Sequence, residues 1–417
     1  MKEYSRHQIL LGILICAVGA MFYCYEFILR IVPGILQNEL RISFGNISAS
    51  VFGQLSALYY FAYSPMQLPV GILMDRFGAR KLLFLACFCC SLGSYLFGFY
   101  SSITVAGIGR FLVGFGSSFA FVGVLASAVS WLPQKYFSTV AGLMTTLGML
   151  GLVYGEIKIS SLANSLTLAN INYLFVGAGF ILTIIIFAVV KDNPNDKYSK
   201  ELPILDFFKQ VGVILKSKRI WIIGFIGACL YTSLSIFGEL WGNEYLAIAH
   251  NLSKTQSAKT ISYMFIGWGI GAPISGFISD KINSRIKPLM LGSIFSLVFI
   301  CIILYTPNVS ISHLNILMLL YGIFSSTEIL VFIMAKESIL NGIPGTIFAV
   351  INMIVTLGGA IFQPLVGKVL DISNSNNIIN QVHIYTPKDY QIALSIIPIC
   401  LILTVLSLLF ISNKKNI

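Results

Sequence analysis

The chain has 417 residues, of which 57% are hydrophobic and only 10% are charged. A soluble protein carries about a quarter charged residues, so this composition excludes an ordinary soluble protein. The apolar residues gather in runs of about 20 or more, the length that a helix needs to cross a bilayer. The short alternating segments typical of a membrane β-barrel are absent. We therefore expect an all-α membrane protein.

Twelve apolar runs follow one another along the chain, six on each side of a polar gap. The first six are expected at residues 8–36, 47–73, 82–100, 104–131, 138–162 and 170–190, and the second six at 219–246, 257–279, 288–306, 314–335, 343–370 and 388–411. This pattern predicts a six-helix bundle over residues 1–190 and another over residues 219–417. A cytoplasmic linker is expected between them, at residues 191–218. Within it, residues 202–215 fit either a short amphipathic helix at the membrane surface or a simple tether.

The 27 lysines and arginines are distributed unevenly between the two sides of the expected membrane. Nineteen lie in the termini and in the alternate loops on one side, whereas only four lie in the opposite loops (Arg41, Lys254, Lys259 and Lys388). This is the positive-inside pattern, which places both termini in the cytoplasm. It attributes the net charge of +11 to topology and not to nucleic-acid binding. A composition rich in Ile, Asn and Lys suits a bacterial protein, for which the location would be the cytoplasmic (inner) membrane.

A short charged run occurs twice, each time between two apolar segments. The first copy, residues 71–81, reads GILMDRFGARK, and the second, residues 276–285, reads GFISDKINSR. We call these runs the first hinge and the second hinge. Their recurrence at corresponding places indicates that the chain consists of two related halves, as many transporters do.

The hinges resemble the signature loop of the major facilitator superfamily, and the resemblance extends over essentially the whole chain. It implies twelve transmembrane helices in two pseudo-symmetric bundles and secondary active transport by alternating access. It also implies that the charged and small hinge residues take part in gating (Gly71, Asp75, Arg76, Gly78, Arg80, Gly276, Asp280, Lys281 and Arg285). The alternative is that the hinge charges are only solvated loop residues that follow the positive-inside pattern. The second hinge departs from the family pattern at Asn283, where a Gly is usual.

Further stretches carry finer resemblances. Arg110, with Gly114 and Gly116, is similar to a family motif in the fourth span that is associated with proton coupling. The first span around residues 23–33 and the second around residues 58–71 look like bacterial relatives of the lysosomal MFSD-type dipeptide carrier and like phagosomal amino-acid transporters. This resemblance implies an amino acid or small peptide as the substrate.

An ionisable residue inside an apolar span costs about 2.5–3.5 kcal/mol to insert and therefore needs a partner or a water-filled cavity. Five such residues stand out on the first, fourth, seventh and tenth spans: Glu26, Arg30, Arg110, Glu239 and Glu328. By their depth and by the family fold, the first half offers cations to a central cavity and the second half offers carboxylates. Such a layout suits a zwitterion. Its carboxylate would meet Arg30 or Arg110, and its amine would meet Glu328 or Glu239.

Other residues complete this hypothesis. Glu26 and Glu328 are the proposed proton-coupling groups, although Glu26 and Arg30, four residues apart, also fit a purely structural ion pair. The expected cavity walls are polar and aromatic (Tyr25, Tyr59, Tyr63, Trp241, Tyr263 and Gln363). Four further charged residues near external helix ends are expected to reach the membrane interface (Glu156, Lys158, Lys368 and Asp371).

The leading hypothesis is a proton-coupled secondary transporter for an amino acid or small peptide. The alternatives are a drug or siderophore exporter, an organic-anion carrier and, less favoured, a non-transporting membrane receptor. The chain has no GxxxxGK[ST] run for a nucleotide, and its eight cysteines lack the spacing of a metal site. We therefore expect no enzyme activity, cofactor or metal. The expected partners are the solute, protons and the lipid bilayer, with the chain acting as a monomer.

Overall fold

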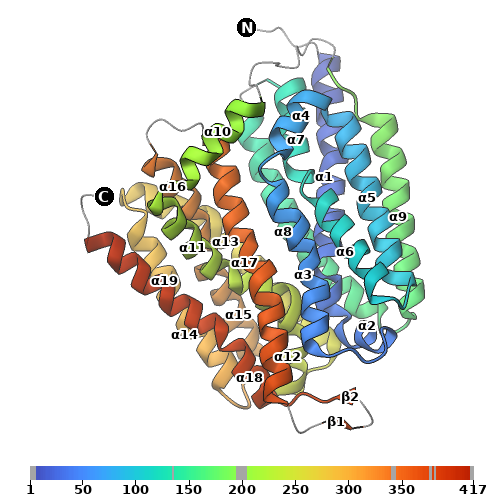
Figure 1. Ribbon diagram of the computed structural model, residues 1–417, viewed down its shortest axis with the longest axis vertical. Coiled ribbons are helices and arrows are strands. Elements are labelled where there is room, and N and C mark those ends of the chain that lie inside the picture. The colour runs from blue at the N-terminus through green and yellow to red at the C-terminus, as the bar shows by residue number, and fades with distance from the viewer. Residues whose placement is uncertain are drawn as a thin grey trace.

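The computed structural model describes residues 6–133, 136–193, 204–339, 344–374, 378–379 and 382–413. In these residues, eleven helices are long and apolar enough to cross a membrane. The remaining predicted span consists of α3 (Ala49–Met66) and α4 (Val70–Phe77), which pass through the molecule beside the others (Figure 1). Tyr, Ser and Gln side chains make α3 more polar than its neighbours. The all-α architecture with twelve spans is as predicted.

The first half of the chain forms the right-hand group of helices in Figure 1. Its elements are α1 (Arg6–Ile35), the short α2 (Gln37–Ser43), α3, α4, α5 (Ala79–Phe99), α6 (Ile103–Ser117), α7 (Ala120–Trp131), α8 (Phe137–Leu162) and α9 (Leu168–Val189). Since α6 and α7 together make one span, six spans result. We call this group the first bundle.

The second half forms the left-hand group, which we call the second bundle (Figure 1). Its elements are α11 (Lys218–Thr232), η2 (Ser233–Trp241), α12 (Gly242–Ala249), α13 (Lys254–Lys281), α14 (Ile286–Tyr305), α15 (Ile311–Ser325), η3 (Ser326–Ile329), α16 (Leu330–Ser338), α17 (Pro344–Ser373), α18 (Pro387–Leu394) and α19 (Ile396–Asn413). Strands β1 (Ile378–Ile379) and β2 (Val382–His383) pair antiparallel, with Ile378 opposite His383. Between the bundles lies α10 (Ile204–Leu215), so this part of the linker is helical.

Two spans of the second bundle leave α-helical geometry partway along their length. The first break is η2, a π-helix, and the second is η3, a 3₁₀ turn. Hydroxyl groups at both places donate to backbone carbonyls three or four residues earlier, which loosens a helix (Thr232, Ser235, Ser325, Ser326 and Thr327). Glu239 lies on η2 and Glu328 lies on η3. Such irregular turns often occur at functional sites.

The two bundles contact each other along α3 and α17, which run antiparallel. Thr356 Oγ1 donates to Ser64 Oγ (2.8 Å), and Asn352 Nδ2 donates to Gln67 Oε1 (2.9 Å). At one end, a Cβ added to Gly367 would lie 2.2 Å from the carbonyl oxygen of Ala49, so only glycine permits this approach of the two backbones.

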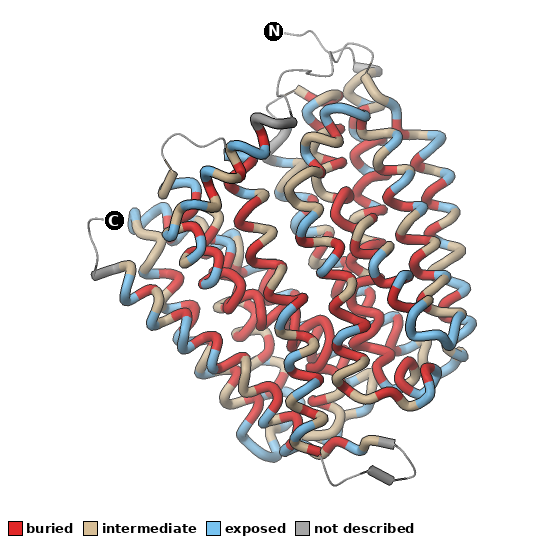
Figure 2. Tube along the Cα trace, in the orientation of Figure 1, coloured by how far each residue is buried: buried red, intermediate tan, exposed pale blue. Residues whose placement is uncertain are grey.

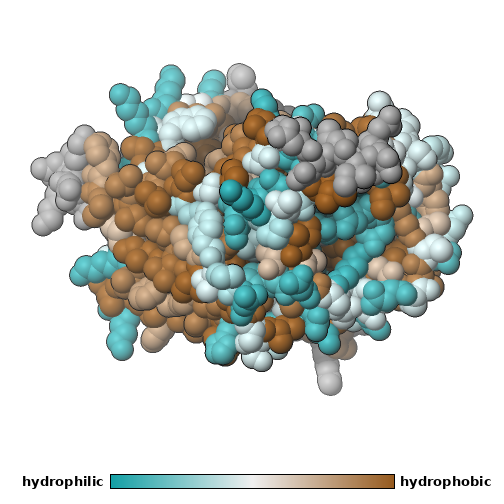
Figure 3. Space-filling model, turned by 90° about the horizontal axis from the view of Figure 1, so that it is seen from below, coloured by the Kyte–Doolittle hydropathy of each residue, from teal (hydrophilic) through white to brown (hydrophobic). Residues whose placement is uncertain are grey.

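Polar contacts between the bundles gather at the face that carries α2, α12 and the strands, which we call the opposite face (lower end in Figure 1). Asp371 Oδ1 and Oδ2 accept from the backbone N–H groups of Ala49 (3.1 Å) and Ser50 (2.9 Å) at the start of α3. Further pairs across this face are Asn38 with Glu244, Glu39 with Lys254, Gln37 with Tyr390, and Asn164 with Thr255. Figure 3 looks at this face and shows hydrophilic residues toward its centre.

The other face, where α1 begins, α19 ends and both hinges lie, is called the terminal face. Two of the hinge cations bond within their own bundle: Arg80 Nη2 donates to the carbonyl of Phe187 (3.1 Å), and Arg285 pairs with Asp280 (2.5 Å) and Glu337 (2.9 Å). Added Cβ atoms at Gly71 and Gly276 would meet nothing within 4 Å. Buried residues concentrate away from this face (Figure 2).

The hinges share one backbone feature. Gly78, between α4 and α5, has a φ of +83°, and Asn283, seven residues after Gly276 as Gly78 is after Gly71, has a φ of +48°. Asn tolerates this left-handed region better than other residues that carry a Cβ. The substitution of Asn for the usual Gly therefore preserves the geometry of the second hinge.

Candidate functional site

A charged cluster lies where α1, α3 and α6 of the first bundle meet η2 of the second. It comprises Glu26 and Arg30 on α1, Arg110 on α6 and Glu239 on η2, and all four side chains are buried. In the ionised state the cluster holds two cations and two anions. The structure therefore brings together four of the five intramembrane charges that the sequence singled out.

Arg30 is the centre of the cluster. Its Nη2 lies 3.2 Å from Glu26 Oε2, its Nε donates to Tyr59 Oη (2.9 Å), and its Nη1 lies 3.8 Å from Glu239 Oε1. Tyr59 in turn donates to Glu26 Oε2 (3.2 Å). Tyr63 stacks on Tyr59 with ring centroids 5.5 Å apart, and the guanidinium lies 5.1 Å from the Tyr63 ring. Arg30 is thus held by one carboxylate from each bundle.

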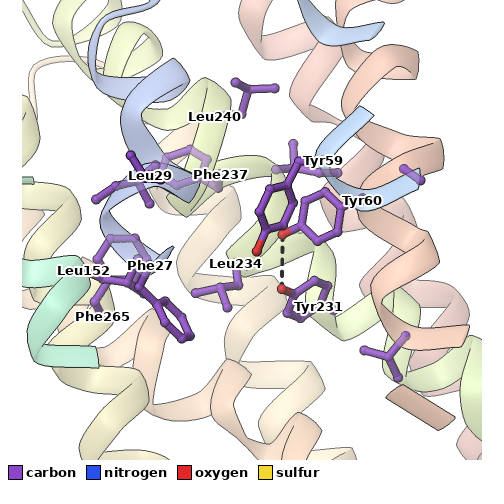
Figure 4. Packing of buried hydrophobic residues seen from close by; sticks show 14 of the residues in the cluster. Phe27, Leu29, Tyr59, Tyr60, Leu152, Tyr231, Leu234, Phe237, Leu240 and Phe265 are labelled. Carbon is purple, nitrogen blue, oxygen red and sulfur yellow. Dashed lines mark hydrogen bonds between the residues drawn. The ribbon is translucent and has the colours of Figure 1, made fainter. Parts of the chain in front are cut away.

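Two tyrosines extend the cluster into the second bundle. Tyr60, on α3, donates its hydroxyl proton to Glu239. The Tyr231 hydroxyl, on α11, lies 3.1 Å from that of Tyr60 (Figure 4). Because the Tyr60 proton is committed to the carboxylate, Tyr231 must be the donor in this second bond. A chain of hydrogen bonds therefore runs from α11 through α3 to η2.

Arg110 is less completely bonded. Its Nη1 donates to the carbonyl of Leu29 (3.0 Å), and its guanidinium lies 5.2 Å from the Tyr59 ring. No carboxylate in the described part of the chain forms an ion pair with it, and its buried Nε has no hydrogen-bond acceptor there. Beside it is a cavity of ≈ 10 Å³, about the size of one water molecule. The cavity is lined by Leu29, Val32, Ser94, Phe97, Arg110, Val113, Asn172 and Phe175.

The remaining candidate residues lie in different places. Trp241 Nε1 donates to the carbonyl of Gln363 (3.3 Å), and Gln363 Nε2 donates to that of Ser235 (2.8 Å), so this pair joins α17 to the π-helix that carries Glu239. Tyr25 donates to the carbonyl of Phe175 inside the first bundle (3.0 Å). Tyr263 is 38% exposed on α13 and is not part of the cluster.

Glu328 is separate from the charged cluster. It is buried on η3, and its Oε1 has no hydrogen-bond donor in the described structure. No described cation forms an ion pair with it. Its isolation agrees with the lack of a nearby cation in the sequence.

The expectation that four charged residues near helix ends reach the membrane interface is wrong for Glu156, which is fully buried and accepts from Asn243. Lys158 and Lys368 are exposed as expected. Asp371 is half-buried and caps α3. Both carboxylates lie where the two bundles meet.

Sequence reasoning also missed Tyr60 and Tyr231. Tyr60 follows Tyr59 directly, so the doubled tyrosine was a visible signal, but only the contact with η2 shows its role.

Among the described residues, no group of three or more His, Cys, Asp or Glu side chains lies close enough to hold a metal ion.

Comparisons with known proteins agree with this architecture. A probable sulfoacetate transporter of Cupriavidus necator is 22% identical over 304 residues, covering 69% of this chain and 68% of the relative. A probable galactarate/D-glucarate transporter of Escherichia coli is 22% identical over 357 residues, covering 76% and 78%. A solved bacterial homologue of the human lysosomal transporter Spinster superposes with a TM-score of 0.75 at 14% identity, over 96% of this chain and 95% of that one.

The identities to these proteins are too low to establish the family, which is instead shown by the match to a family model. The model described as Major Facilitator Superfamily matches residues 9–363, which is most of the chain. The protein is thus a multi-pass membrane transporter of small organic solutes and not an enzyme. The chain belongs to the Major Facilitator Superfamily.

Proposed function

We propose that this transporter carries a small solute with a carboxylate or similar acid group, together with a proton. The observation behind this proposal is Arg110, a buried guanidinium of the first bundle without a carboxylate partner in the described chain. A guanidinium binds a carboxylate through two parallel hydrogen bonds, and burial strengthens that interaction.

The charge balance of the cluster supports coupling to a proton. Glu26 and Glu239 already neutralise the cluster, so one acid group of a solute, bound between Arg30 and Arg110, would leave one excess negative charge away from water. Such a charge is costly in the membrane. A proton on Glu26 removes the excess and releases Arg30 from one partner. Anion and proton would then enter together, with Tyr59 and Tyr63 as walls.

The names of the relatives support an organic acid, since sulfoacetate and galactarate are both small anions. An amino acid or small peptide is the second candidate, because Glu239 Oε1 and Glu328 Oε1 lack hydrogen-bond donors in the described structure and would suit an ammonium group. In that case Glu328 is a second proton or amine site. Export of lipophilic cations is less well supported, because two arginines lie in the same cluster.

Alternating access would exchange which face is closed. We assign the terminal face to the cytoplasm from the positive-inside pattern, so that the contacts across the opposite face make this an inward-facing state. The bundles 1–190 and 219–417 would move as units in the inner membrane, within a monomer. In the outward-facing state, Asp75 and the other hinge residues would gain partners across the terminal face.

The test is ligand binding and uptake by the purified full chain in proteoliposomes. Binding of glucarate, sulfoacetate, alanine and dialanine is measured first. We expect Arg110→Gln to weaken binding of the acidic ligand about 10- to 100-fold, the range for a lost hydrogen-bonded charge, and an imposed proton gradient to drive uptake. Lys368→Gln, a change at an exposed lysine, serves as the control. Unchanged acid binding in Arg110→Gln would refute the role of Arg110, and tighter binding of alanine than of either acid would favour the second candidate.

A further inference from the structure

A buried carboxylate–amide pair joins the two bundles apart from the charged cluster. Glu156 lies on α8 of the first bundle and is fully buried, and Asn243 lies on α12 of the second and is 8% exposed. Asn243 Nδ2 lies 3.2 Å from Glu156 Oε1 and 3.0 Å from Oε2. The pair exists only while α8 and α12 are in contact, so it reports on closure of the opposite face.

No cation balances Glu156 in the described structure. On α1, α8, η2, α12 and α13, the other charged residues whose side chains the structure describes are Glu26, Arg30, Lys158, Glu239, Glu244, Lys254, Lys259, Asp280 and Lys281. None of these forms an ion pair with Glu156. The cations among them are exposed or engaged elsewhere: Lys158, Lys259 and Lys281 are exposed, Lys254 pairs with Glu39, and Arg30 pairs with Glu26 and Glu239.

The hydrogen bonding of the pair is incomplete if Glu156 is ionised. One amide group then serves both carboxylate oxygens, and Asn243 Oδ1 is buried without a donor. An unpaired buried acceptor is costly, and an ionised carboxylate without a cation is more so. A protonated Glu156 would resolve both problems with a small rotation of the Asn243 amide: its hydroxyl would donate to Asn243 Oδ1, while Asn243 Nδ2 would donate to the acid carbonyl.

We propose that Glu156 is a proton-binding site, and that its proton is bound when the bundles close at the opposite face. This inference goes beyond the proposed function, in which the coupling groups are Glu26 and Glu328, and it rests on alternating access but not on the identity of the solute. The direction in which pH shifts closure follows from the contact between Glu156 and Asn243. Protonation favours the closed opposite face, and loss of the proton at higher pH favours its opening, because the carboxylate then gains water.

The direct test is infrared difference spectroscopy of the full chain in lipid nanodiscs without any solute. Wild type at acid pH should show the carbonyl band of a protonated, amide-bonded carboxyl group, and Glu156→Gln should lack it. A wild-type spectrum from which Glu156→Gln removes no such band would overturn the proposal. This readout depends on no transport activity, so it stands or fails separately from the organic-acid proposal.

A second test measures closure by pulsed electron spin resonance. Spin labels are placed at Ile42→Cys on α2 and Lys388→Cys on α18, both exposed, in a background without native cysteines. If one proton controls closure, the ratio of molecules with a closed opposite face to molecules with an open one should fall as pH rises. The slope of this ratio against pH should be up to about tenfold per pH unit. Glu156→Gln, which keeps the shape and the hydrogen bonds of the protonated acid, should lose that slope. Glu39→Gln, on the same face, should keep it. An equal slope in wild type and Glu156→Gln would refute the proposal.

Discussion

The cap that Asp371 places on α3 offers a quantitative test of how the opposite face is held closed. Its carboxylate accepts from the N–H groups of Ala49 (3.1 Å) and Ser50 (2.9 Å), and from the hydroxyl of Tyr385 (2.5 Å). Asp371 belongs to α17 of the second bundle, whereas α3 belongs to the first. The cap therefore exists only in the closed arrangement.

Replacement Asp371→Ala should shift the equilibrium toward an open opposite face. Ser48, the N-cap residue of α3, keeps its own bond to the N–H of Val51. Loss of the Asp371 carboxylate should therefore cost no more than loss of an N-cap, about 0.5–2 kcal/mol. At about 1.4 kcal/mol per factor of ten, the closed-to-open ratio should fall about 2- to 30-fold. Asp371→Asn keeps an acceptor but loses the charge, so its effect should be smaller.

The assay is the spin-label distance between residues 42 and 388 at constant pH. Asp389 provides a matched control, because it caps α18 from within the same bundle by accepting from the N–H of Thr386 (2.8 Å). Asp389→Ala should lower thermal stability without changing the distance distribution. Equal distance distributions in wild type and Asp371→Ala would refute the idea that this cap holds the bundles together.

Two further predictions concern the same face. A Cβ added to Gly34 would lie 2.3 Å from the carbonyl oxygen of Glu239, whereas one added to Gly71 would meet nothing within 4 Å; Gly34→Val should therefore prevent closure in the spin-label assay and Gly71→Val should not, and full closure in Gly34→Val would contradict this packing. Burial lowers the pKa of His250, which lies just beyond α12, so its neutral form is favoured in the folded protein. As pH falls through about 6.5, the imidazole of His250 takes up a proton more readily in the unfolded chain than in the folded protein, so stability is lost. His250→Gln should therefore reduce the drop in melting temperature between pH 7 and pH 5. An unchanged drop would contradict the lowered pKa of His250.

The sequence predicted those features that depend on local spacing. The spans follow from run length, and the ion pair of Glu26 with Arg30 follows from a separation of four residues on one helix. The hinge positions follow from the repeat, and Asn283 adopts the positive φ that its place in the repeat requires. The proximity of Glu26, Arg30 and Arg110 was expected from their depth in the spans and from the family fold, whereas the direct ion pair of Arg30 with Glu239 was not.

Contacts between the bundles could not be predicted in this way. Asp371 and Ser50 are 321 positions apart, and Glu156 and Asn243 are 87 apart. Neither separation carries a periodic signal, and near a helix end a charged residue is expected to reach water. The π-helix at Ser233–Trp241 could not be predicted from the sequence either, although its hydroxyl residues are a weak indication of a loosened helix.

The placement of charges suggests how solute and closure are linked. Arg30 is bound by Glu26 from its own helix and by Glu239 from the other bundle, so the ion pair with Glu239 is itself one of the contacts between bundles. An anion that binds Arg30 and Arg110 would compete with Glu239 for the same guanidinium. Under our proposal, the solute and a proton on Glu26 therefore replace the existing contacts of Arg30, while Tyr60 keeps Glu239 hydrogen-bonded. A ligand shifts a conformational equilibrium only through such a difference in contacts between the two states. The cluster at Arg30 supplies that difference near the solute, and Glu156 with Asn243 would supply it for a proton at the opposite face.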